Sequence, residues 1–258
     1  MIRLDRHPTW AGGNPCDGFE APCGIIYTNH KQIFKDNWYD FAYNIATRYP
    51  DVTNWILWNE PNLAENFSPQ SPLNPTGLVS EYMDLIQFPG HNAITTAIPS
   101  ARMIGPDIFT PSGGNEGYTC DYWNHCMNWL SGWTDSLLRY FPSFFETFSI
   151  HNYSIDERAQ VSAVSKVWNK MVGLGVQRRI WLTEFNYRNG TCSEPEWSIA
   201  NWTQSLYQKM TWERSFYFVL QDPEGQGCGF GLLYGRQLEF LEKTPLYSRF
   251  QQIVAAIP

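Results

Sequence analysis

The sequence predicts an α/β fold in which short parallel strands, buried on both faces, alternate with amphipathic helices. Six apolar runs without polar alternation are typical of such strands; they are Ile2–Leu4, Trp55–Trp58, Arg102–Gly105, Thr147–Ile150, Arg179–Leu182 and Ser215–Leu220. Segments with helical character lie between them, at about 31–48, 77–98, 122–141, 156–174, 196–213 and 245–256. This alternation favours a parallel sheet that is covered by helices.

Composition excludes several classes of protein. No repeat, low-complexity tract or block of charge interrupts residues 1–258, so we expect a single domain. A hydrophobic fraction of 43% is enough for a substantial core, which argues against general disorder. No run of eighteen apolar residues occurs, so we expect no membrane partner. The net charge is −7, with only 18 Lys and Arg, and this argues against nucleic-acid binding.

The chain is rich in aromatic residues, with 12 Trp, 14 Tyr and 16 Phe. Large rings fill hydrophobic cores, and their flat apolar faces also suit sugar rings in a binding cleft. The composition by itself leaves both interpretations open.

Six cysteines suggest disulfide bonds in an oxidising compartment, and therefore a secreted protein. The short spans Cys16–Cys23 and Cys120–Cys126 favour two local pairs, which would leave Cys192–Cys228 as the third. The alternative is six buried thiols in a cytosolic enzyme. Four sequons also occur, at Asn66, Asn152, Asn189 and Asn201. The first residues are not a signal peptide, so we expect a chain that has been trimmed.

Two predicted strands are each followed by a glutamate. Glu60 lies in the segment WNEPN and Glu184 in the segment WLTEFN. Barrel enzymes keep their chemistry at the carboxyl ends of their parallel strands, where an unpartnered carboxylate is costly to bury. Two such carboxylates at one barrel mouth could supply the acid and the nucleophile that break a glycosidic bond. The alternative is that each one caps a helix or pairs with an arginine.

The segment WNEP and the place of Glu184 resemble clan A of the glycoside hydrolases, the retaining barrel enzymes that include families 5 and 39. The resemblance runs in element order from about residue 2 to residue 256 and implies a (β/α)8, TIM-barrel-like fold. It implies that Glu60 is the general acid/base and Glu184 the nucleophile. Asn59 would then hydrogen-bond the sugar 2-hydroxyl, a contact that strengthens in the transition state.

The same resemblance assigns further residues to substrate binding. The segment DRH is similar to the Asp-x-His that ends strand three in family 5, which would place His7 in the glycone subsite; the alternative is an ordinary turn histidine. His151 and Tyr153 end the run that corresponds to strand six, and Tyr153 would donate to Glu184, unless it is a packed rim aromatic. Trp10 would stack on a sugar, unless it only packs against protein.

The chain departs from the clan's pattern before Glu60. About sixty residues precede this glutamate, too few for three βα units of roughly 30 residues each, so we expect about six units with the first two absent. A fragment of a longer gene, an open barrel whose loops cover its edges and a dimer that covers them would each explain this. Because unpaired parallel edges are a liability, we expect a homo-oligomer; a monomeric mass from light scattering at high dilution would contradict it.

These observations predict a retaining glycoside hydrolase that cleaves β-linked oligo- or polysaccharides by double displacement, with no metal and no organic cofactor. An alternative from another class is a carbohydrate-binding protein that derives from such an enzyme and has little or no turnover. A transglycosylase would use the same two glutamates and pass the sugar to another sugar instead of water. The sequence leaves the sugar and the linkage open.

Overall fold

The computed structural model describes about three fifths of the chain. The described part comprises residues 1–4, 31–63, 66–67, 75–110, 118–120, 126–153, 157–176, 178–186, 214–217, 221–222, 233–234, 242–243 and 251–252.

The chain divides into two compact units. The first unit comprises Met1–Phe109, Asn115–Ile150 and Val167–Ile180, and the second comprises Thr110–Gly114, His151–Lys166 and Trp181–Pro258. The single domain expected over 1–258 stays a prediction.

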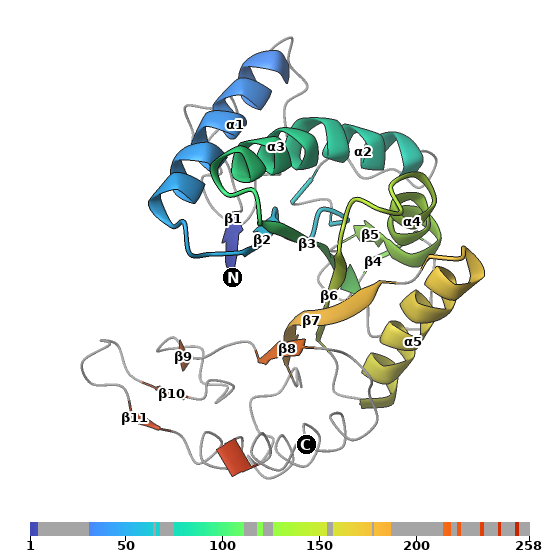
Figure 1. The fold of residues 1–258 in the computed structure, drawn as a ribbon. Helices are drawn as coiled ribbons and strands as arrows, with labels where there is room; N and C mark the ends of the chain where they lie inside the picture. Colours follow the sequence, from blue (N-terminus) through green and yellow to red (C-terminus); the bar gives the residue numbers. More distant parts are fainter. Residues whose placement is uncertain are drawn as a thin grey trace. The chain divides into compact units, whose positions relative to one another are not determined.

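The main sheet has six strands in the order β1-β2-β3-β6-β7-β8 (Figure 1). The pairs β1–β2, β2–β3 and β7–β8 are parallel. All six predicted strands are present, which confirms the α/β fold. Within the described residues β1 and β8 are the outer strands of this sheet, as six units in place of eight imply. The strands are β1 Ile2–Leu4, β2 Asn54–Leu57, β3 Arg102–Thr110, β6 Thr147–Tyr153, β7 Arg179–Asn186 and β8 Arg214–Tyr217.

Three strands run further toward their carboxyl ends than the apolar runs predicted. β3, β6 and β7 each continue beyond the predicted run and include polar residues, some of which bond across the sheet. The Thr110 hydroxyl donates to the backbone carbonyl of His151 at 2.8 Å, and Asn152 Nδ2 donates to Thr110 Oγ1 at 2.5 Å. His151 therefore lies within β6, and Glu184 lies within β7 instead of after it.

Helix α1, Lys31–Arg48, has the predicted bounds. Its buried residues recur at four-residue spacing, which gives the apolar stripe of an amphipathic helix; they are Phe34, Trp38, Ala42 and Ala46. The predicted helix at 77–98 is three consecutive segments: α2 Pro75–Tyr82, the π-helical η2 Met83–Gln87 and α3 Phe88–Ala97.

Helices α1 and α3 pack side by side in the first unit (Figure 1). Gly90 permits this approach, since a Cβ built there would lie 2.8 Å from the side chain of Leu57 and 2.9 Å from that of Trp38.

The helix predicted at 122–141 begins later than expected. Residues before it form an antiparallel pair, β4 Tyr118–Cys120 and β5 Cys126–Asn128, followed by the π-helical η3 Trp129–Thr134 and helix α4 Asp135–Tyr140. Backbone pairing with β4 holds Cys126–Asn128 extended, which overrides any local helical preference. The register places Cys120 directly opposite Cys126, which agrees with the expected local pair, although the disulfide itself stays a prediction.

Helix α5, Glu157–Gly173, lies within the predicted 156–174. A small three-stranded sheet joins β9 Gln221–Asp222, β10 Leu233–Tyr234 and β11 Glu242–Lys243 in the order β11-β10-β9. The helix expected at 196–213, and that at 245–256 apart from residues 251–252, lie outside the described residues. No helix in the described part combines the length and the apolar character that a membrane span requires.

Candidate active site

Glu60 follows β2 on a loop whose backbone is unusual. Trp58 has φ 79° and Glu60 has φ 44°, which lie in the left-handed region that residues other than glycine rarely occupy. Such conformations persist only where surrounding contacts hold them. The backbone N–H of Trp58 donates to the carbonyl of Leu4 at 2.6 Å, and its indole packs edge-on against Trp38 at 5.8 Å between ring centroids. The buried Trp58 is therefore the first anchor of this loop.

Two amide groups converge on one oxygen of Glu60. Nδ2 of Asn59 and Nδ2 of Asn66 each lie 3.4 Å from Oε2 of the glutamate. The indole Nε1 of Trp58 donates to the backbone carbonyl of Asn66 at 2.9 Å. The tryptophan that fixes the start of the loop therefore also holds the backbone of Asn66.

Asn62 fastens the loop to the neighbouring strand. Its side chain is fully buried, Nδ2 donates to the carbonyl of Phe109 at 2.8 Å, and Oδ1 accepts from the N–H of Phe109 at 2.9 Å. An asparagine that satisfies both backbone groups of a strand residue acts like one more residue of the sheet. The loop is thus joined to β3 at a point two residues after Glu60.

Phe67 is the last anchor of the loop. It is 2% exposed and packs edge-on against Tyr82 and Trp133, with ring centroids 5.7 Å and 5.9 Å away. Such edge-to-face geometry is favourable beyond the area that it buries.

Tyr82 holds the end of β2 through a hydrogen bond. Its hydroxyl donates to the carbonyl of Leu57 at 3.0 Å and accepts from the amide of Gln87. Burial raises the pKa of Tyr82 well above its ordinary value of 10.0, the hydrogen bond from Gln87 opposes this, and the charge of Asp107 adds to it. The hydroxyl therefore stays neutral and remains a donor to Leu57.

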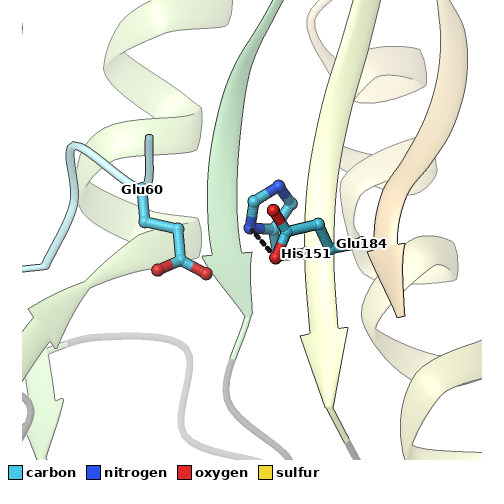
Figure 2. Close-up of side chains that lie close together, drawn as sticks. All are labelled: Glu60, His151 and Glu184. Atoms are coloured by element: carbon cyan, nitrogen blue, oxygen red, sulfur yellow. Dashed lines mark ion pairs between the residues drawn. The ribbon is translucent and has the colours of Figure 1, made fainter. Parts of the chain in front are cut away.

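Glu184 is paired with His151 in the second unit. Nδ1 of His151 lies 3.6 Å from Oε2 of Glu184, and a dashed line marks this pair in Figure 2. The two side chains are 0% and 12% exposed. A carboxylate with so little exposure needs a polar or charged neighbour. The imidazole supplies one, as a cation when it is protonated and as a dipole when it is neutral.

The positions of the predicted site residues differ in how far the structure describes them. Asn59 contacts Glu60, and His151, which was assigned to substrate binding, contacts Glu184. Tyr153 lies in β6 two residues after His151, and its side chain is outside the described part. His7 and Trp10 also lie outside the described residues.

Sequence reasoning missed Asn62 and Asn66 as supports of Glu60. Asn62 belongs to the segment WNEPN, and Asn66 was noted only as the start of a sequon. The signal that could have found them is an asparagine-rich loop directly after a candidate acid.

Figure 2 draws the side chains of Glu60, His151 and Glu184. His151 and Glu184, both in the second unit, offer an imidazole and a carboxylate, which are donor types of some catalytic zinc sites. Two glutamates are also what a retaining glycosidase requires. The expected absence of a metal stays a prediction.

Comparisons with known proteins agree with the prediction of a barrel glycoside hydrolase. Residues 29–237 match the family model described as glycosyl hydrolase catalytic core. Two solved structures of a GH128 endo-β-1,3-glucanase from Amycolatopsis mediterranei are similar at 16% identity. The complex with laminaritriose has a TM-score of 0.54 and covers 85% of this chain and 79% of that one. The complex with laminaripentaose has a TM-score of 0.52, with 87% and 79% covered.

A glucosidase from Croceicoccus marinus is similar at a TM-score of 0.50 and 13% identity; 71% of this chain is covered, but only 38% of the glucosidase. The chain thus spans about two fifths of that protein's length. No curated protein matches significantly. At these identities the structural likeness concerns the fold alone, and it confirms the TIM-barrel-like architecture. Because the family model covers most of its length, the chain belongs to the glycosyl hydrolase catalytic core family.

Proposed function

We propose that this protein is a retaining β-glycoside hydrolase in which Glu60 is the general acid/base and Glu184 the nucleophile. The observation that carries the proposal is the place of the two glutamates in a glycosyl hydrolase core: Glu60 lies three residues after the end of β2, and Glu184 lies near the carboxyl end of β7 in the same sheet. Carboxyl ends of strands are where barrel enzymes gather their catalytic groups.

The reaction would proceed in two steps. In the first, the carboxylate of Glu184 attacks the anomeric carbon while the carboxylic acid of Glu60 gives its proton to the departing glycosidic oxygen. This forms a glycosyl ester on Glu184 and releases the aglycone as an alcohol. In the second, the carboxylate of Glu60 takes a proton from water, whose oxygen attacks the anomeric carbon and frees Glu184.

The surroundings of the two glutamates differ. His151 places Nδ1 3.6 Å from Oε2 of Glu184, a contact that orients this carboxylate. Glu60 faces neutral amides, those of Asn59 and Asn66, within the described residues. The two carboxyl groups therefore have different neighbours.

We further propose a β-1,3-glucan as the substrate class. The support is the fold likeness to the GH128 glucanase, whose structures hold laminari-oligosaccharides. Water as the acceptor gives hydrolysis, whereas a second sugar would give transglycosylation through the same intermediate.

The test is covalent trapping with a 2-deoxy-2-fluoro β-laminaribioside that carries a good leaving group, followed by intact mass and peptide mapping. We expect one sugar on the peptide that contains Glu184, and none on a Glu184→Gln variant. Glu146→Gln, a change at a glutamate whose side chain is 58% exposed, is the matched control and should label like the wild type.

A label on another residue would contradict the assignment of the nucleophile. Absence of any label, together with laminari-oligosaccharide binding by calorimetry and no product from laminarin, would favour the carbohydrate-binding alternative.

A further inference from the structure

We propose that Asn66 is a positioning residue for Glu60, which fixes the carboxyl group so that Oε1 carries the catalytic proton. This inference rests on the proposed role of Glu60 as the acid/base.

The direction of the hydrogen bonds determines which oxygen of Glu60 carries the proton. An amide nitrogen can only donate, so Oε2 of Glu60 must accept from both Asn59 and Asn66, each at 3.4 Å. A carboxylic acid whose one oxygen accepts two N–H groups places its own proton on the other oxygen. Both bonds are long, as catalytic hydrogen bonds often are before substrate binds.

Asn59 alone could not fix the carboxyl group, because it is adjacent to Glu60 in the chain and moves with it. Asn66 comes from the far end of the loop and is tied to the core independently. Its N–H donates to the carbonyl of Leu63 at 3.1 Å, and its carbonyl accepts from the indole of Trp58.

The next residue strengthens this attachment. Phe67 is buried between Tyr82 and Trp133, and its N–H donates to the carbonyl of Leu63 at 3.0 Å. Asn66 is therefore held by two buried aromatic residues, Trp58 and Phe67. Its side-chain amide in turn holds the carboxyl group of Glu60 in one orientation.

Asn66 is also the first residue of a sequon. The nitrogen to which a glycan would be attached is the atom that contacts Oε2 of Glu60.

The experiment compares two substrates that differ in their need for an acid. A 2,4-dinitrophenyl β-laminaribioside has a leaving group that departs without protonation, whereas a phenyl β-laminaribioside requires it. For Asn66→Ala we expect kcat/KM on the phenyl substrate to fall about tenfold to a hundredfold, with little change on the dinitrophenyl substrate. Asn44→Ala, an exposed site on α1, is the matched control and should leave both unchanged.

An equal loss on both substrates, or no loss on either, would overturn the inference, since a merely structural role would not distinguish the leaving groups. Asn66→Leu, which keeps about the volume of the side chain and removes its donor without adding a charge, should show the same split and carries the test if Asn66→Ala fails to fold.

Glu60→Ala separates this inference from the proposed function. If Glu60→Ala loses kcat/KM on the phenyl substrate alone and the Asn66 variants do not, only the inference is wrong. If the wild type is inactive on both substrates, or Glu60→Ala keeps both rates, the proposed function is wrong and the inference falls with it.

Discussion

Glu60 and Glu184 are held in opposite ways. Glu184 belongs to strand β7, where the backbone pairing of the sheet sets the direction of each side chain. Glu60 lies outside any strand, on a loop with left-handed backbone at two of three consecutive residues. Its position depends on side-chain contacts from Trp58, Asn62 and Phe67.

This difference indicates which substitutions would displace each glutamate. A side chain on a central strand keeps its direction as long as the sheet forms, so we expect its neighbours to tolerate substitution. A loop with left-handed backbone carries a strain of roughly 1–3 kcal/mol for each unusual residue. It is stable only while the free energy gained from its anchoring contacts is larger than this strain. Residues that never touch a substrate should therefore affect Glu60 more than Glu184.

The largest expected effect is on catalysis and concerns Glu184 on strand β7. Glu184→Ala should lower kcat at least about a thousandfold, because removing a nucleophile abolishes the covalent route. Added azide should restore part of the rate by occupying the space of the lost carboxylate. Steady-state kinetics on an aryl β-laminaribioside measures this, with Glu146→Ala as the exposed control; a variant that keeps a tenth of the activity would refute the role.

Phe67→Ala tests the aromatic anchor of the loop. We expect a loss of about 3–5 kcal/mol in the free energy of unfolding, as is usual for truncating a fully buried phenylalanine. Chemical denaturation measures it. Phe88→Ala, at a site that is 39% exposed, should cost much less. Similar losses at the two sites would show that Phe67 does not anchor the loop.

Asn62→Ala tests the attachment of the loop to β3. Both backbone groups of Phe109 would lose their partner, and we expect a loss of about 2–3 kcal/mol. Asn62→Asp keeps an acceptor for the N–H of Phe109 and removes the donor, so it separates the two bonds. Equal stability of the wild type and Asn62→Ala in urea would contradict the attachment.

The smallest effect concerns the two ion pairs that Asp135 makes with Arg139 and Lys170, away from both glutamates. Burial acts to raise the pKa of Asp135, but hydrogen bonds and charges from Arg139 and Lys170 outweigh it and lower the pKa from its ordinary 3.8. The two pairs stabilise the fold above about pH 4 and lose that effect as the pH falls through the lowered pKa.

Asp135→Asn should therefore lower the melting temperature slightly at pH 7, and the difference should vanish in strong acid. The groups are partly exposed, so the effect is small. Thermal unfolding at a series of pH values measures it; a difference that grows toward low pH would contradict the assignment.

Much of the fold could be predicted because it is encoded locally. Each of the six strands coincides with an apolar run, and α1 has the bounds that its periodicity indicates, since burial patterns repeat with the period of the element that buries them. The expectation of a helix was wrong over 126–128, because strand pairing there overrides local preference, while residues 122–125 lie outside the described part.

The sequence by itself determined the two candidate glutamates and the chemistry they suggest, because a rare motif at the end of an apolar run is visible without coordinates. It could not determine that His151 would be the described partner of Glu184, or that Asn62 and Asn66 would hold the Glu60 loop. Those contacts join residues that the chain separates, or depend on a left-handed backbone that no periodicity records. Only tertiary packing, which places Phe109, Tyr82 and Trp133 around one loop, decided them.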